Sequence, residues 1–295
     1  MKFRVGSRDS RLAAAQSEWV LSALRAAHPE VEWELVTMKT TGDKILDRTL
    51  DQIGGKGLFV KELDMALRDG RVDLTVHSCK DLPAEIPEDL PVAAFTRRED
   101  PRDVLVLPQG VTEWDRSRPA GTSSPRRRLQ CGELFPDVEI LPVRGNVLTR
   151  LRKLDEGQYG ALILAAAGLK RLGLEGRISR WFAPSELIPA AGQGILAVQC
   201  RRDMDASLLE CLRDPAAEAC ARAERAFVRA LDGGCSSPTA AFAAAEDGRI
   251  TIMGLHVDGQ NHIFRQTISG PLAEGEALAD TLAARLKEAV LCVEK

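Results

Sequence analysis

Hydrophobic positions over the first 95 residues switch between the alternation of strands and the three-to-four spacing of helices. Leu12, Trp19 and Leu24 fall on one face of a helix, and Asp9 and Ser10 offer side-chain oxygens that can cap its start. The pattern also predicts strands over residues 2–7, 31–38, 72–76 and 92–95 and a helix over residues 60–67. Strands that alternate with helices are typical of an α/β domain, whose functional loops lie at strand ends.

This alternation continues after residue 96 and then changes. The second stretch predicts an α/β domain, with strands over 104–107, 139–141 and 161–165 and helices after Pro125 and from Asn146. A strand over 195–200 follows the loop 189–194, and its pattern alone does not assign it to either sheet. The remaining pattern is typical of a small α+β domain, with helices over 215–231 and 276–293 and strands over 239–245, 249–257 and 262–268.

Length and composition place the chain among multidomain globular proteins. Its 295 residues exceed the roughly 150 of one average domain, and 44% hydrophobic with 28% charged residues is an ordinary globular composition. Net charge is −3 and there are only eight Phe, four Trp and one Tyr, which disfavours a nucleic-acid partner. The longest apolar run, 161–167, is far shorter than the roughly 20 residues that span a bilayer, so we expect a cytoplasmic protein without a membrane partner.

Positive charge is concentrated in one part of the chain. Residues 116–153 hold nine Lys and Arg but three Asp and Glu. Within them, Gly121 to Arg128 places hydroxyl residues directly before a helix with Pro125 in its first turn, and Arg144-Gly145-Asn146 repeats this arrangement. Helix N-termini with nearby arginines bind anions, although a basic helix face in water has the same composition. We expect an acidic small molecule as the ligand.

A polar pentad, His77-Ser78-Cys79-Lys80-Asp81, follows a predicted buried strand. Lys80 is suited to binding a carboxylate, and Asp81 to acid–base work or to stabilising a developing cation. The alternatives are a core or loop histidine at position 77 and a surface ion pair between Lys80 and Asp81. For the glycine-rich stretch 54–57 three interpretations remain open: a flexible lid, an anion-binding turn, or a turn without a binding role.

The cysteine pattern argues against disulfides and metal sites. Seven cysteines, an odd number, stand at 79, 131, 200, 211, 220, 235 and 292, with no CxxC and no histidine at zinc-ligand spacing. Most are expected to be small buried hydrophobic residues. Cys235 differs because it follows the glycines that end a predicted helix and precedes a loop.

Taken together, these motifs resemble the porphobilinogen deaminase (hydroxymethylbilane synthase) family over nearly the whole chain. The motifs that carry the resemblance are residues 6–10, 41–43, 54–59, 77–83, 98–103, 121–127, 144–146, 164–172, 192–194 and 233–235. The resemblance implies two α/β domains of the periplasmic-binding-protein type around a cleft and a small α+β C-terminal domain. It assigns residues 1–96 and 195–212 to domain 1, 97–194 to domain 2 and 213–295 to domain 3.

The family resemblance also implies a reaction and a cofactor. Members are transferases of porphyrin and haem biosynthesis that join four porphobilinogen molecules head to tail with loss of ammonia. They then release the linear tetrapyrrole hydroxymethylbilane with water. The chain grows on a dipyrromethane cofactor held through a thioether, which the motif match assigns to Cys235. The family further implies a monomer.

Residue roles follow from the same motif match. Asp81 is assigned to catalysis. Cofactor binding is assigned, besides Cys235, to Ser78, Lys80, Thr122, Ser123, Ser124, Arg126, Arg127 and Gln193. Substrate binding is assigned to Arg8, Ser10, Gln16, Arg144, Gly145, Asn146, Arg150 and Arg171, and a mobile loop to Lys56 and Phe59. Departures from the family pattern are Arg11, Gln52 and Cys79.

A different class of protein shares part of this pattern. A binding or sensing module with an arginine-rich cleft between two α/β domains would hold a dicarboxylate without catalysis. Such a module needs neither a carboxylate in the cleft opposed to its anionic ligand nor a modified cysteine. Asp81 and Cys235 therefore distinguish the two hypotheses.

Overall fold

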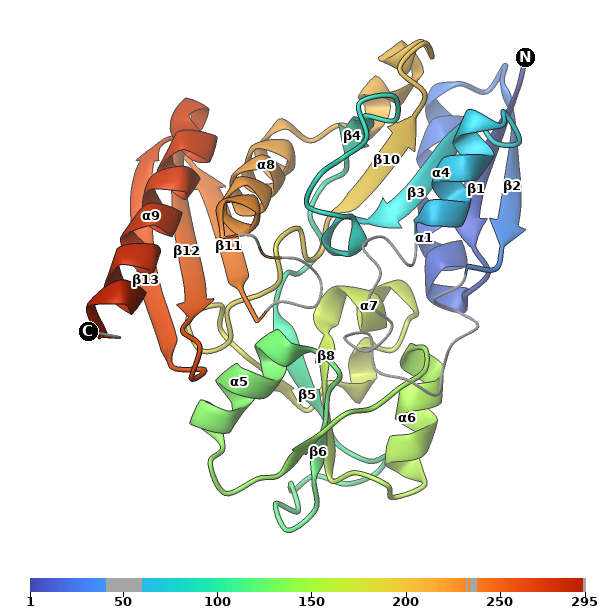
Figure 1. The fold of residues 1–295 in the computed structure, drawn as a ribbon. Coiled ribbons are helices and arrows are strands. Elements are labelled where there is room, and N and C mark those ends of the chain that lie inside the picture. Colours follow the sequence, from blue (N-terminus) through green and yellow to red (C-terminus); the bar gives the residue numbers. More distant parts are fainter. Residues whose placement is uncertain (41–59, 232, 234–237, 294–295) are drawn as a thin grey trace.

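The computed structural model describes residues 1–40, 60–231, 233 and 238–293. The strands in this part of the chain form three sheets, and we call each sheet with its helices a lobe (Figure 1). The first sheet has the order β2-β1-β3-β10-β4. Its strands are β1 (Lys2–Arg8), β2 (Glu32–Met38), β3 (Leu74–Ser78), β4 (Val92–Phe95) and β10 (Leu196–Cys200).

Helices pack on the first sheet as the hydrophobic pattern predicts. Helix α1 (Arg11–Ala27) begins after Ser10, whose side chain accepts a hydrogen bond from the backbone N–H of Ala13, so Ser10 rather than Asp9 is the cap. Its buried face, with Leu21 and Leu24, packs on β1, β2 and β3. The further elements of this lobe are α4 (Lys61–Arg68), η1 (Cys79–Asp81) and η3 (Ala206–Leu212).

The second lobe is a mixed sheet in the order β7-β6-β8-β5-β9. Its strands are β5 (Asp103–Val106), β6 (Ala120–Gly121), β7 (Ile140–Leu141), β8 (Ala161–Ala165) and β9 (Arg180–Trp181). Its helices are α5 (Pro125–Leu134), α6 (Val147–Asp155), α7 (Ala166–Arg171) and η2 (Glu175–Arg177). Parallel pairing of β6 with β7 and β8 brings the starts of α5 and α6 to the same edge of this sheet.

Two segments connect the first and second lobes. The chain leaves after β4, and it returns to form β10, which pairs antiparallel with both β3 and β4. The connecting segments are hydrogen-bonded to each other, with the Glu99 N–H donating to the Gly194 carbonyl at 3.1 Å. Gly194 has a φ of +92°, and a Cβ there would lie 2.2 Å from the Glu99 carbonyl oxygen. The strand that the pattern left unassigned thus belongs to the first sheet, as the family resemblance implied.

The third lobe is an antiparallel sheet covered by two helices (Figure 1). Its elements are α8 (Pro215–Ala230), β11 (Ala240–Glu246), β12 (Arg249–Val257), β13 (Ile263–Pro271), η4 (Leu272–Glu274) and α9 (Gly275–Val293). Phe227 of α8 and Leu282 of α9 pack against Ile252 of β12 in its core. This is the α+β arrangement that the sequence predicts.

The described residues include no helix long and apolar enough to cross a membrane. They also include no cluster of three or more His, Cys, Asp or Glu side chains that could hold a metal ion. Cys79, Cys131, Cys200 and Cys220 are buried, whereas Cys211 and Cys292 are exposed.

Candidate active site

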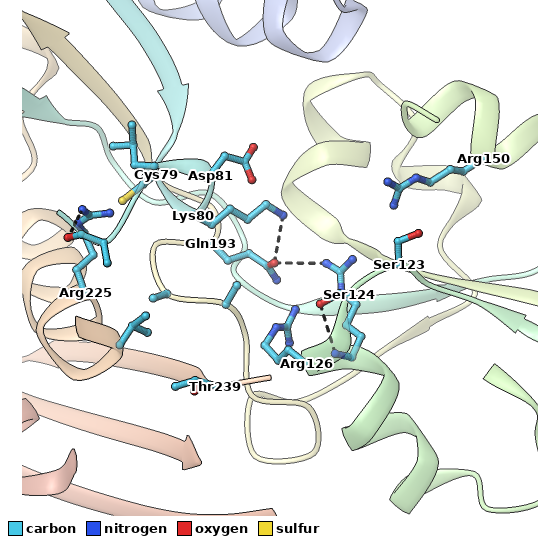
Figure 2. Close-up of a pocket in the computed structure, with 16 residues that line it drawn as sticks. Cys79, Lys80, Asp81, Ser123, Ser124, Arg126, Arg150, Gln193, Arg225 and Thr239 are labelled. Carbon is cyan, nitrogen blue, oxygen red and sulfur yellow. Dashed lines mark hydrogen bonds between the residues drawn. The ribbon is translucent and has the colours of Figure 1, made fainter. Parts of the chain in front are cut away.

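A cavity of about 210 Å³ lies where the three lobes meet (Figure 2). The first lobe and the returning segment supply Cys79, Lys80, Asp81, Leu82, Ala84, Ala190, Ala191 and Gln193. The second lobe supplies Ser123, Ser124, Arg126, Arg127 and Arg150, and the third supplies Arg225, Val228 and Thr239. Asp81 is the only carboxylate among these lining residues, against five lysine and arginine side chains. The cavity therefore favours an anionic ligand.

The turn η1 presents Lys80 and Asp81 to the cavity. It follows β3 directly, and the Cys79 N–H donates to the Ile195 carbonyl at 2.9 Å, which fixes the turn against the start of β10. Nζ of Lys80 donates to Oε1 of Gln193 at 3.3 Å. Burial and the neighbouring Arg127 lower the pKa of Lys80 to about 8, although Asp81 and Asp103 oppose this shift.

The opposite wall is the start of α5. Ser124 caps this helix, with its Oγ accepting from the Arg127 N–H, and Pro125 occupies the first turn. Arg126 and Arg127 are 4% and 7% exposed and both are paired with Asp103. Nε of Arg126 has no hydrogen-bond partner within the part of the chain that the structure describes. A buried donor without a partner on the cavity wall fits an acceptor group from a ligand.

Arg150 reaches the cavity from α6. Its Nε donates to the Gly145 carbonyl at 2.8 Å, and burial followed by the nearby Arg127 and Arg144 lowers its pKa to about 10. Gly145 has a φ of +111°, and a Cβ there would lie 2.6 Å from the Thr149 methyl group, so the turn requires glycine. Figure 2 shows the Arg150 guanidinium and the Asp81 carboxylate pointing toward each other across the cavity.

The third lobe closes the cavity through α8. Arg225 donates to the carbonyls of Pro83 and Ala84, at 2.7 and 3.1 Å, and so holds the segment that follows Asp81. Glu224, the residue before Arg225 in α8, does not line the cavity and pairs with Arg98. The third lobe thus fixes the turn that carries Asp81.

Several other residues that the sequence singles out do not line this cavity. Ser10 and Asn146 are helix caps, and Gln16 and Ser78 are hydrogen-bonded to each other at 3.0 Å. Arg171 donates to the Gly194 carbonyl at 2.6 Å, on the connecting segments. Arg8, Thr122, Arg144 and Gly145 also lie off the lining, and Cys235, Lys56 and Phe59 lie outside the described residues.

Two residues of the pentad have structural explanations. His77 is buried with its Nε2 2.9 Å from the Thr75 hydroxyl, and burial together with Arg8 lowers its pKa to about 3. His77 is therefore a neutral core histidine, one of the alternatives that the sequence left open. Cys79 lines the cavity wall but has no exposed surface, and burial raises its thiol pKa to about 11.

Sequence reasoning assigned no role to Asp103, Arg98, Glu224 or Arg225. Asp103 stood within the motif 98–103, and its available signal was a carboxylate at the start of an apolar strand. Arg225 and Glu224 stood within an ordinary amphipathic helix. Their partners are more than 20 residues away in sequence, so no local pattern marks them.

Fold and cavity are those of a three-lobed protein whose basic cavity favours a small anionic ligand and carries one carboxylate among its lining residues. A family model described as "Porphobilinogen deaminase, dipyromethane cofactor binding domain" matches residues 3–209, and "Porphobilinogen deaminase, C-terminal domain" matches residues 218–288. The chain belongs to the porphobilinogen deaminase family. Its function is the polymerisation of porphobilinogen in tetrapyrrole biosynthesis, which makes it a transferase that uses a dipyrromethane cofactor.

Curated relatives match nearly the full chain. The porphobilinogen deaminase of Alkaliphilus oremlandii is 56% identical over 287 residues, which is 97% of both chains. That of Acetivibrio thermocellus is 55% identical over 283 residues, 96% of this chain and 97% of the relative. Among solved structures, the BenM effector-binding domain with benzoate has a TM-score of 0.41 at 17% identity, covering 72% of this chain and 88% of that one. The Escherichia coli aliphatic sulphonate binding protein SsuA has a TM-score of 0.42 at 14% identity, covering 78% and 70%.

Proposed function

We propose that Asp81 is the catalytic carboxylate of this porphobilinogen deaminase. The observation that carries the proposal is the position of Asp81: among the described residues that line the cavity it is the single carboxylate, and it lies with Lys80, Arg126, Arg127 and Arg150. A site that only binds a polycarboxylate gains nothing from a carboxylate facing its ligand, because like charges repel. A carboxylate in this position is favourable when the reaction develops a positive charge on the substrate, which the carboxylate then stabilises.

Loss of ammonia from porphobilinogen leaves an electron-poor azafulvene cation. A carboxylate held in place by the protein stabilises such a cation better than water does, since it needs no reorganisation as the charge forms. Asp81 is held in this way because two hydrogen bonds fix the chain on either side of it. The Cys79 N–H donates to the Ile195 carbonyl, and Arg225 donates to the Pro83 carbonyl. The same carboxylate accepts the proton lost when the new pyrrole regains its aromaticity, which makes it a general base as well.

The dipyrromethane cofactor fits a set of donor side chains on the cavity lining, which we call the basic wall: Lys80, Arg126, Arg127 and Gln193. When bound, it supplies the pyrrole on which the product chain grows. The buried Nε of Arg126 has no hydrogen-bond partner within the described chain, so we expect it to donate to an acetate or propionate group of the cofactor. Lys80, Ser123, Ser124, Arg127 and Gln193 provide further donors on the cavity lining. Ser78 and Thr122 are assigned to the same role by the motif match alone. Cys235 provides the thioether.

Incoming porphobilinogen is bound next to this wall. Arg150 is the substrate-binding residue on the cavity, and its partner Gly145 and the capping Asn146 shape the turn before α6. The other proposed substrate contacts are Arg8, Ser10, Gln16, Arg144 and Arg171, with Lys56 and Phe59 on the covering loop. Carboxylates of a growing polypyrrole need several separate cations, and these arginines come from both α/β lobes.

Intact mass spectrometry tests the covalent part of the proposal. The purified wild-type protein is expected to carry the mass of two pyrrole units, and the Cys235→Ser variant to lack it. Cys211→Ser is the matched control, because Cys211 is an exposed cysteine away from the cavity and its replacement leaves the adduct in place. A wild-type chain without the adduct and without turnover of porphobilinogen would contradict the proposed function.

We further propose that the enzyme acts as a cytoplasmic monomer without nucleic-acid or membrane partners. A net charge of −3 and the scarcity of aromatic residues support the absence of a nucleic-acid partner. Sedimentation equilibrium of the holoenzyme at micromolar concentration is expected to give 32.1 kDa. A mass of twice this value would refute the monomer.

A further inference from the structure

Asp103 is a buried carboxylate whose two oxygens together accept four hydrogen bonds from three side chains. It is the first residue of β5, which lies between β8 and β9 in the second sheet, and it has no exposed surface. Oδ2 accepts from Nη1 of Arg126 at 2.7 Å. Oδ1 accepts from Nη2 and Nε of Arg127, at 2.7 and 3.0 Å, and from Nε2 of Gln193 at 2.8 Å. Although burial alone would raise the pKa of the Asp103 carboxyl, the two arginines hold it well below its usual range.

The partners of Asp103 line the cavity, whereas Asp103 itself does not. Two guanidinium groups and one side-chain amide are thus oriented by a group that does not reach the ligand. The Gln193 amide in turn orients Lys80, because its Oε1 accepts from Nζ of Lys80 at 3.3 Å and from Nη2 of Arg127 at 3.4 Å. A single carboxylate therefore sets the geometry of four donor side chains on the basic wall.

Asp103 affects Lys80 through its negative charge as well as through the hydrogen bonds of Gln193. The ionised groups that face Lys80 are Asp81 from its own turn, Asp103 from β5, and Arg126 and Arg127 from α5. Burial is the largest influence and lowers the pKa of Lys80, and the two arginines act in the same direction. Asp81 and Asp103 raise it again. Without Asp103, three buried cations would face one carboxylate.

We propose that Asp103 is a positioning residue of the basic wall, which holds Arg126, Arg127 and Gln193 in place and keeps Lys80 in its charged, anion-binding form. The proposal rests on the proposed function, because it assumes that this wall binds the dipyrromethane cofactor. It assigns a role to a residue that touches neither cofactor nor substrate. Removing the Asp103 carboxylate is therefore expected to change the pKa of Lys80.

The sign of that change separates positioning from simple loss of structure. In Asp103→Asn, a neutral amide replaces the charge that raises the pKa of Lys80, so Lys80 is expected to lose its proton at lower pH than in the wild type. A variant that merely opens the cavity has the opposite effect. Hydration returns the pKa of Lys80 from about 8 toward its ordinary value of 10.5.

Trace acetylation measures this protonation directly. Cofactor-loaded wild type and Asp103→Asn are treated with a small amount of acetic anhydride over a series of pH values, and labelling of Lys80 is quantified by peptide mass spectrometry. The midpoint for Lys80 is expected to fall in Asp103→Asn, with several-fold more labelling at neutral pH. Asp155→Asn is the matched control, because Asp155 also pairs with an arginine of the second lobe, Arg177, but far from the cavity. Its Lys80 midpoint is expected to equal that of the wild type.

Intact mass on the same samples separates failure of this inference from failure of the proposed function. A normal two-pyrrole adduct in Asp103→Asn, with an unchanged or raised Lys80 midpoint, overturns the positioning role alone. A wild type without the adduct overturns the proposed function.

A second pair of variants covers the case in which Asp103→Asn does not fold. Arg127→Gln and the double variant Asp103→Asn/Arg127→Gln are then compared, since the double variant leaves one buried guanidinium without its carboxylate, that of Arg126, where Asp103→Asn leaves two. The Lys80 midpoint is expected to be lower in the double variant than in Arg127→Gln. Equal midpoints overturn the inference.

Discussion

Arg98 and Glu224 form an ion pair in the interior, with Nη1 of Arg98 2.7 Å from Oε1 of Glu224 and no exposed surface on the Glu224 side chain. The same carboxylate accepts from the N–H groups of Gly192 and Ala243, at 2.6 and 2.7 Å. Arg98 and Gly192 belong to the segments that connect the two α/β lobes, whereas Glu224 and Ala243 belong to the third lobe. This carboxylate therefore fixes the third lobe to the connection between the other two.

Replacing Arg98 by Met is expected to destabilise the protein by about 3–5 kcal/mol, because it leaves the Glu224 charge buried without its partner. Urea unfolding followed by tryptophan fluorescence measures the loss. Arg68→Met is the control, since the Arg68–Asp89 pair is exposed and such pairs contribute little to stability. Equal small losses in both variants would show that the buried pair does not hold the third lobe.

Asp81→Asn is expected to fold, to retain its cofactor and to lose most of its turnover. An amide of the same shape keeps the packing of the turn but cannot stabilise a cation or accept a proton. Loss of general base function alone is worth roughly 100-fold or more in rate. The measurement is the rate of hydroxymethylbilane formation, together with intact mass for the cofactor. Asp89→Asn, a change to an exposed carboxylate eight residues along the chain, serves as the control with near wild-type rates. Near-normal turnover in Asp81→Asn would remove Asp81 from catalysis.

Arg150→Gln is expected to stall chain elongation. Arg150 faces the cavity with its guanidinium largely removed from water, so its loss leaves a carboxylate of the growing chain without a partner. Intact mass spectrometry after limited exposure to porphobilinogen reports the enzyme-bound intermediates, which should accumulate at particular lengths. Arg152→Gln, two residues further along α6 and exposed, controls for the loss of a positive charge. An unchanged distribution of intermediates in Arg150→Gln would contradict its role.

Asp64 gives the stability of the first lobe a pH dependence. Burial raises the pKa of this carboxyl from 3.8 to about 6, despite the nearby Arg68. Because the folded protein holds the proton more tightly than the unfolded chain, stability is lost as the pH rises from about 4 to about 6 and stays reduced above that range.

Asp64→Asn removes this cost and is expected to be more stable than the wild type at pH 7 by on the order of 1–2 kcal/mol. The advantage should disappear near pH 4, where both proteins are uncharged at this position. Thermal unfolding at a series of pH values tests this, with Asp69→Asn at the exposed end of the same helix as the control. A constant difference between Asp64→Asn and the wild type at all pH values would refute the explanation.

Part of the candidate site could be predicted from the sequence because its residues stand in short motifs at the ends of elements. Lys80 and Asp81 follow a strand, and Ser124 precedes a helix with proline in its first turn. These local signals predict both the elements and the anion-binding chemistry. The same signals did not distinguish residues that line the cavity from residues that do not. Ser10 and Asn146 cap helices, and Arg171 donates a hydrogen bond to the Gly194 carbonyl in a connecting segment.

The sequence by itself determined the elements, the segregation of positive charge and, through its motifs, the family. Hydrophobic periodicity and helix capping are local properties, so they can be read from neighbouring residues. The hydrophobic pattern did not place β10, whose return to the first sheet was implied by the family resemblance and is seen in the tertiary structure. Only the tertiary structure decided that Arg126 and Arg127 share a buried carboxylate and that α8 supports the turn carrying Asp81. These relationships join residues from about 20 to more than 140 positions apart, and their strength comes from burial that exists only once the lobes have packed together.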